Sequence, residues 1–209
     1  MTILPLEPLA NRAPGCQGCA MNVLLIGPPG SGKGTQGDRL AERLGLEHIA
    51  AGDLLRAEVT ADTALGRRVT DYMRRGDLVP DIVILSLLMP KVLAAADNQG
   101  YLLDGFPRSV EQAVEARKLA EQVGASPDAV IYLDAPRDVL VARIVARAEI
   151  EGRSDDNLET VTNRLRVFDE ATAPLVDYYR GRGLLHVVNA DQHEDEVTAE
   201  ILAALSVSD

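Results

Sequence analysis

Aromatic residues, lysine and cysteine are all scarce in this sequence. Its 209 residues include two Phe, five Tyr, two Cys and no Trp, and only three lysines accompany 18 arginines. With so few aromatic side chains, a buried core has to be built mainly from Leu, Val, Ile and Ala. A chain of this length is expected to form one domain with one core.

An excess of positive charge and long apolar runs are missing as well. The 21 Lys and Arg are outnumbered by 32 Asp and Glu, which gives a net charge of −11 at pH 7. This balance argues against a nucleic-acid partner. No apolar run reaches the ~18 residues of a membrane span, and residues 1–20 lack a signal-peptide pattern. We therefore expect a cytoplasmic protein without a membrane partner, and the length and acidity favour a monomer.

The two cysteines, Cys16 and Cys19, form a Cys-x-x-Cys pair near the N-terminus. Such a pair can be half of a zinc site or a redox motif. The sequence has no second cysteine pair, and no helix of a βαβ unit follows this one, so neither role is favoured. Residues 1–20 are predicted to be a disordered extension, and Met21 is an alternative start of the protein.

Five short apolar runs alternate with helical patterns along the chain. The runs predict strands over residues 21–26, 46–49, 100–105, 129–134 and 184–188. The helical patterns cover residues 35–44, 109–123, 136–148 and 193–205. This alternation predicts an α/β fold of three layers, with a central five-stranded parallel sheet between helices. The ligand of such a sheet should lie at the carboxyl ends of its strands.

Two segments depart from the alternation. Residues 50–79 favour helix and contain no strand pattern, which predicts a small helical insertion. Residues 148–157 are polar and lie between two helical patterns, so we expect a hinge-like segment there. Two such segments could close over a bound substrate and keep water out.

The stretch GPPGSGKGTQ at residues 27–36 joins the first predicted strand to the first predicted helix. Phosphate-binding loops usually have Ser or Thr directly after the lysine, whereas here Gly34 comes first and Thr35 second. Glycines let backbone N–H groups point at a phosphate, and the helix N-terminus and Lys33 add positive charge. Because this chain otherwise uses arginine, a lysine here indicates a need for a compact ammonium. The stretch predicts a P-loop that binds nucleotide phosphate.

A nucleotide site of this kind needs Mg²⁺, and an aspartate at a strand end is its usual partner. Asp104 and Asp134 both end predicted strands. Asp134 is explained as well by capping the helix that follows it. Asp104 leads into Arg108, which brings a cation to the same edge of the sheet. Asp104 is therefore the favoured magnesium residue.

Several arginines gather around the polar segment of this acidic protein. Arg143 and Arg147 lie four residues apart and share a helix face, which is mildly destabilising unless an anion lies between them. Arg153, Arg164 and Arg166 belong to the same group, whereas Arg56 and Arg108 lie elsewhere in the sequence. One loop binds one polyphosphate, so the spare arginines indicate a second phosphorylated substrate. A guanine-nucleotide switch is excluded because its Asn-Lys-x-Asp motif is missing.

Four motifs follow one another in a recognisable order. They are GPPGSGKGTQ at 27–36, GDLLR at 52–56, LDGFPR at 103–108 with Gln112, and GRSDDN at 152–157. Together they resemble adenylate kinases and the related nucleoside monophosphate kinases. The resemblance implies a nucleoside monophosphate kinase domain over residues 21–209, with residues 50–79 as its monophosphate-binding insertion and residues 148–157 as a short lid.

The resemblance also implies an activity, reversible phosphoryl transfer from MgATP to AMP to give two ADP, and a role for each matching residue. The catalytic cations would be Lys33, Arg108, Arg147, Arg153 and Arg164. ATP would be bound by Gly30, Ser31, Gly32, Lys33, Gly34, Thr35 and Arg143, with the arginine stacked on the adenine. AMP would be bound by Ala51, Arg56, Val79, Gly105, Arg108, Gln112, Arg153 and Arg164, with Gln112 at the base. Mg²⁺ would lie near Thr35 and Asp104, and Asp104 would reach it through water.

Departures from the family pattern leave alternatives open. Ala50 and Ala51 stand where adenylate kinases usually have a Ser-Thr pair, and an alanine before Gly52 resembles the UMP/CMP kinases. Loss of a hydroxyl from a base pocket costs about 0.5–1.5 kcal/mol, so relaxed acceptor specificity is a further alternative. Ser109 follows Arg108 where the pyrimidine kinases tend to have Asn, which favours AMP.

The lid departs from the family as well. Ala148, Glu149 and Glu151 stand where relatives often have glycine and fewer acids. This is the one feature in favour of a nucleotide-binding protein that has lost its chemistry. Long-lid relatives often carry a zinc-binding cysteine cluster, but this segment has no Cys, so we expect no structural zinc.

Overall fold

The structure is a computed structural model that describes residues 21–151 and 158–206. Cys16, Cys19 and the rest of the predicted extension lie outside these residues, as do residues 152–157 of the predicted lid, Arg153 among them. Within the described ranges, no helix is long and apolar enough to cross a membrane.

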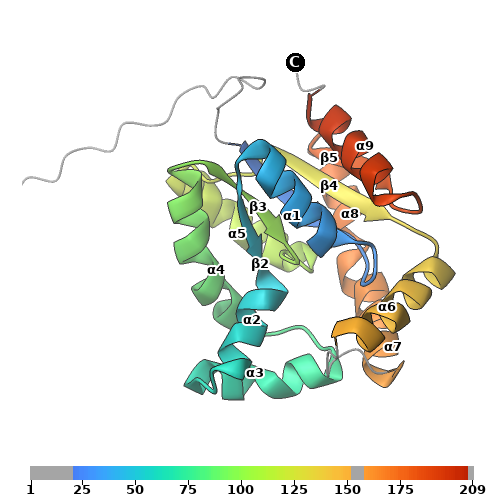
Figure 1. Cartoon of the computed structure of the whole chain (residues 1–209). Helices are drawn as coiled ribbons and strands as arrows, with labels where there is room; N and C mark the ends of the chain where they lie inside the picture. Colours follow the sequence, from blue (N-terminus) through green and yellow to red (C-terminus); the bar gives the residue numbers. More distant parts are fainter. Residues whose placement is uncertain (1–20, 152–157, 207–209) are drawn as a thin grey trace, which may run out of the picture.

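A five-stranded parallel sheet forms the centre of the molecule, in the order β2-β3-β1-β4-β5 (Figure 1). The strands are β1 (Met21–Ile26), β2 (Glu47–Ala50), β3 (Gly100–Asp104), β4 (Ala129–Asp134) and β5 (Leu185–Asn189). Each strand lies within one residue of its predicted bounds, and the predicted parallel sheet is confirmed. The carboxyl end of β1 lies between those of β3 and β4, with Leu25 opposite Asp104 and Ile26 opposite Tyr132.

Apolar side chains along β1 point alternately to the two faces of the sheet, which explains why helices cover both faces. Val23 and Leu25 point to one face, which is covered by α1 (Lys33–Leu44) and α9 (Glu194–Ser206). Leu24 and Ile26 point to the opposite face. Their neighbours there come from α4 (Asp81–Ala96), α5 (Val110–Val123) and α8 (Leu175–Arg180).

Helix α4 has no counterpart among the predicted elements. Its sequence is apolar nearly all round and contains Pro90, so it shows no amphipathic stripe. Its buried residues nevertheless lie mostly on one side, with Ile84, Leu88 and Val92 at four-residue spacing, while Ile82 on the other side is 76% exposed. Because apolar residues also occupy the exposed side, the helical period does not show in the sequence.

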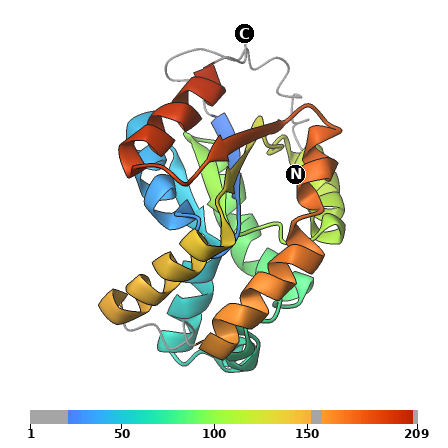
Figure 2. The same ribbon diagram turned by 90° about the vertical axis from the view of Figure 1, so that its right-hand side faces the viewer.

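Two helix pairs border the carboxyl ends of the strands. The first pair is α2 (Ala51–Thr60) and α3 (Ala64–Arg75), and the second is α6 (Arg137–Glu151) and α7 (Leu158–Val167), which runs on into a π-helical turn (Phe168–Thr172). Residues 148–151 of the predicted lid thus continue α6. The two pairs meet where α3 ends (Figures 1 and 2), since Thr160 donates to the Arg74 carbonyl at 2.8 Å and Asn163 to the Arg75 carbonyl at 2.7 Å.

Candidate functional site

A cavity of about 950 Å³ lies at the carboxyl ends of β1 and β3. It brings together side chains and loops that are far apart in the sequence. The predicted site residues that line it are Gly30, Ser31, Gly32, Lys33, Gly34, Thr35, Arg56, Asp104, Gly105, Arg108, Arg143, Arg147 and Arg164. The ligand position expected for a parallel sheet is therefore where the predicted residues converge.

The loop between β1 and α1 needs glycine at two positions. Gly30 and Gly32 have φ angles of 84° and 89°, in the left-handed region that other residues rarely adopt. A Cβ on Gly30 would also lie 2.6 Å from the Leu140 carbonyl oxygen, so α6 packs directly against the loop. Gly32 caps α1, and the loop therefore ends with the free N–H groups of a helix N-terminus facing the cavity.

Lys33 is the first residue of α1, and its ammonium folds back over the loop. Its Nζ donates to the carbonyl oxygens of Gly27 at 2.8 Å and Pro28 at 2.9 Å. Burial lowers the pKa of Lys33 to about 8, which the carboxylate of Asp104 opposes. Repulsion from Arg108, Arg147 and Arg164 acts in the same direction as burial and contributes to this value. An anion in the cavity would relieve this repulsion.

Asp104 brings a carboxyl group close to these cations. Burial raises the pKa of its carboxyl, while Lys33, His48 and Arg108 act in the opposite direction. Asp104 and the Thr35 hydroxyl both line the cavity and are hard oxygen donors, which is the ligand chemistry that Mg²⁺ prefers. Over the described part of the chain, no group of three or more His, Cys, Asp and Glu side chains is arranged to hold a metal ion.

Arg108 is held in place by the segment that follows β3. Its Nε donates to the Gly105 carbonyl at 2.8 Å, and its own carbonyl accepts from the Thr172 hydroxyl at 2.8 Å. Gly105 has a φ of 79°, which lets the chain turn back beside the guanidinium. Burial and the nearby Arg164 both lower the pKa of Arg108. Arg56, on α2, lines the same cavity and is paired with Asp53.

The other end of the cavity lies between α6 and the segment around the start of α9. There Arg143 donates from Nη1 to the Ala190 carbonyl at 2.8 Å. This end is also lined by Gln36, Arg39, Gln192 and Glu194, none of which was predicted as a site residue. Gln36 belongs to the loop motif at residues 27–36. Its side chain is buried by contact with α9, which the surrounding polar sequence does not indicate.

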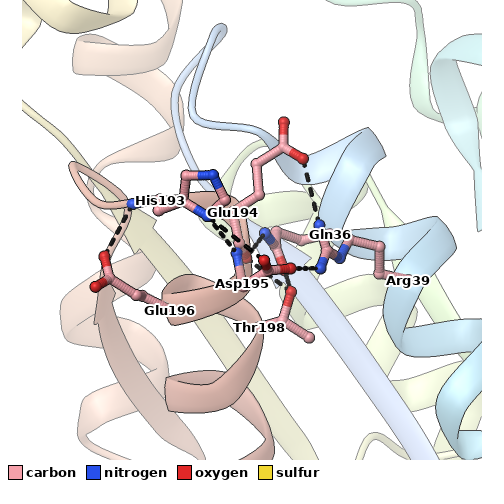
Figure 3. Close-up of polar contacts among 7 residues, drawn as sticks. All are labelled: Gln36, Arg39, His193, Glu194, Asp195, Glu196 and Thr198. Atoms are coloured by element: carbon pink, nitrogen blue, oxygen red, sulfur yellow. Dashed lines mark hydrogen bonds and ion pairs between the residues drawn. The ribbon is translucent and has the colours of Figure 1, made fainter.

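Figure 3 shows how Gln36, Arg39 and Glu194 join α1 to α9. The Gln36 side chain donates to the Glu194 carbonyl at 2.9 Å and accepts from the Thr198 hydroxyl at 2.7 Å. Arg39 forms ion pairs with the carboxylates of Glu194 and Asp195. This network fixes the wall of the cavity that α9 provides.

Among the residues that the structure describes, three predicted site residues do not line the cavity. Ala51 is buried at the start of α2, Val79 packs against the core, and Gln112 is only 4% exposed at the start of α5. Gln112 is nonetheless joined to the cavity wall, because its Oε1 accepts from the Arg108 backbone N–H at 2.8 Å.

Comparison with known proteins gives one consistent result. A family model described as adenylate kinase matches residues 25–184. An adenylate kinase of Stenotrophomonas maltophilia (strain R551-3) is 45% identical over 185 residues, which cover 88% of this chain and 99% of that protein. An adenylate kinase of Thermus thermophilus is 46% identical over 185 residues, which cover 88% of this chain and 97% of that protein. One of Leptospira biflexa serovar Patoc (strain Patoc 1 / Ames) is 42% identical over 183 residues, with 88% and 98% covered.

Proposed function

The chain belongs to the adenylate kinase family, and on this premise we propose that it transfers the terminal phosphoryl group of ATP to AMP and releases two ADP. One observation supports this reaction above the others. Lys33 is close enough to Arg108, Arg147 and Arg164 for their repulsion to lower its pKa, although the protein as a whole is acidic. A cavity with this excess of positive charge suits two phosphorylated substrates better than one.

The site residues divide into three sets in this proposal. The loop amides and Lys33 hold the β- and γ-phosphates of ATP, and Arg143 contacts its adenine. Arg56 and Arg108 hold the phosphate of AMP, while Arg147, Arg153 and Arg164 gather on the transferring group. Arg153 lies outside the described residues, so its role rests on the sequence motif.

The chemical step follows from these positions. A phosphate oxygen of AMP attacks the γ-phosphorus, the bond from that phosphorus to the β,γ-bridging oxygen breaks, and the bridging oxygen leaves on ADP. The acceptor oxygen is already anionic, so no general base is needed. Removing one well-placed cation from such a site typically costs about 3–4 kcal/mol of barrier.

Mg²⁺ is the cofactor that we propose for this site. Thr35 and Asp104 would hold it, and Asp104 would act through water. When bound, the ion would offset negative charge on the β- and γ-phosphates. We further propose that residues 21–209 act as one kinase domain, with residues 50–79 binding the monophosphate and residues 148–157 forming a short lid. Composition alone supports a cytoplasmic monomer without nucleic-acid or membrane partners.

The acceptor base is tested by a coupled assay with MgATP and one acceptor at a time. We expect kcat/KM with AMP to exceed that with CMP, UMP, GMP or dAMP. Ala51 favours the second candidate, because a UMP/CMP kinase also lacks a hydroxyl there. Higher turnover with CMP or UMP than with AMP would support that candidate. ATP binding without turnover of any acceptor would instead indicate a nucleotide-binding protein that has lost its chemistry.

A further inference from the structure

Gln112, the residue expected at the acceptor base, is clamped at both ends of its side-chain amide. It is the third residue of α5, and its backbone N–H donates to the side chain of the N-cap residue Ser109 at 3.2 Å. Its Oε1 accepts from the Arg108 backbone N–H at 2.8 Å, and its Nε2 donates to the Asp81 carboxylate at 2.7 Å. Asp81 is the first residue of α4, so the clamp joins two helices.

The two partners leave the amide only one orientation. A backbone N–H can only donate, so it must face the amide oxygen. An ionised carboxylate can only accept, so it must face the amide nitrogen. Reversing the Gln112 amide would place two donors together at Arg108 and two acceptors together at Asp81. Each end of the amide still keeps one free position, a lone pair on Oε1 and a hydrogen on Nε2.

A fixed amide distinguishes two classes of nucleobase. Adenine and cytosine present an amino donor beside a ring-nitrogen acceptor, whereas guanine and uracil present a carbonyl acceptor beside a ring N–H donor. An amide whose oxygen and nitrogen are held in a fixed order can form both hydrogen bonds with only one of these patterns. With the other pattern, its N–H faces a donor and its oxygen faces an acceptor. The order of the two atoms therefore selects between amino and oxo bases.

We propose that Asp81 is a positioning residue that fixes the Gln112 amide and thereby makes the acceptor site select amino-bearing bases over oxo-bearing ones. The inference rests on the proposed function and on the role that the family pattern gives Gln112, which is contact with the acceptor base. It explains how the acceptor site can select a base although Ala51 offers no hydroxyl to that base. It also sets a rank order among minor acceptors, with CMP above UMP.

The cleanest test compares AMP with IMP, which differ only in an amino group and an oxo group on the same purine. The wild-type ratio of kcat/KM for AMP over IMP is expected to be at least about tenfold. Asp81→Ala removes the acceptor of Nε2 and should lower this ratio at least about fivefold, mainly through a higher KM for AMP. Asp81→Asn keeps one acceptor oxygen and should give an intermediate ratio. The kcat with AMP and the KM for ATP should change little.

Asp97→Ala is the matched control, because Asp97 caps the other end of α4 and is exposed. It removes the same side chain from the same helix and should leave the AMP/IMP ratio unchanged. The ratio does not depend on the folded fraction, so a loss of stability in a variant cannot imitate the effect. An unchanged ratio in Asp81→Ala, or a wild-type enzyme that uses IMP as well as AMP, would overturn the inference. A wild-type protein without activity toward AMP would instead overturn the proposed function.

Discussion

Lys33 shows how a single residue serves both the loop and the charge of the site. Two carbonyl oxygens of the loop hold its ammonium, Asp104 attracts it, and three arginines repel it. Its pKa of about 8 is far below the ordinary value of 10.5. In the enzyme without bound nucleotide, the Lys33 side chain is therefore protonated below pH 8, and it loses its proton as the pH rises through about 8.

This shift predicts the pH dependence of ATP use. The kcat/KM for MgATP reports the free enzyme, so it should fall as the pH rises through about 8. Bound polyphosphate favours the charged ammonium and raises its pKa, so kcat should hold to a higher pH. Initial rates between pH 6.5 and 10 measure both profiles. Lys33→Arg is the control, because a guanidinium does not titrate in this range. The kcat/KM of this variant should be lower than that of the wild type, but it should not fall as the pH rises through 8. A flat wild-type profile up to pH 10 would contradict the assignment.

Individual site residues were predictable where they depart from the residue usage of the rest of the chain or stand at the end of a predicted strand. Lys33 stood out because the chain uses lysine so rarely, and Asp104 because it ends a strand and leads into an arginine. The contacts of Gln36 with Glu194 and Thr198 could not be predicted, since about 160 residues separate the partners. The positions of Ala51, Val79 and Gln112 were carried over from a family pattern, which does not state how a side chain is held.

Helices α1 and α9 meet through a buried polar contact next to the cavity. Gln36 is 3% exposed and uses both ends of its amide, on the Glu194 carbonyl and the Thr198 hydroxyl. The ion pairs of Arg39 nearby are partly exposed to solvent, so each contributes little. The buried amide is therefore the stronger polar link between the two helices.

Gln36→Ala should lower the free energy of unfolding by about 1–3 kcal/mol, because it removes a buried amide and leaves its partners less satisfied. Urea denaturation followed by circular dichroism measures the change. Gln99→Ala is the matched control, since Gln99 is exposed and its change should stay within about 0.5 kcal/mol. Equal midpoints for the two variants would show that the contact does not stabilise the fold.

The elements themselves could be predicted to different extents. Strands were predicted well because buried parallel strands are short apolar runs that end at turns. Helix α1 begins at Lys33, two residues before its predicted start, because the loop turns straight into the helix at Gly32. Helix α4 was missed because its exposed side also carries apolar residues such as Ile82, so no polar face reveals its period.

At the scale of the whole molecule, charge is separated between surface and cavity. The protein carries a net charge of −11, yet its cavity is lined by Lys33, Arg56, Arg108, Arg143, Arg147 and Arg164, among other residues. The order of the strands, β2-β3-β1-β4-β5, is what assembles this set, since it places the loop after β1 beside the end of β3. Sequence patterns predicted the strands but not their order, which depends on contacts between segments far apart in the chain.

The most direct test of the proposed reaction starts from ADP and Mg²⁺ alone. A protein that exchanges a phosphoryl group between ATP and AMP must also run in reverse, so it should convert ADP into equal amounts of ATP and AMP. Chromatography of the nucleotides measures both products over time, and Lys33→Met should form them at least about a hundredfold more slowly. ATP and AMP appearing together in a one-to-one ratio is the predicted result. No ATP from ADP, or AMP with free phosphate in place of ATP, would contradict the account.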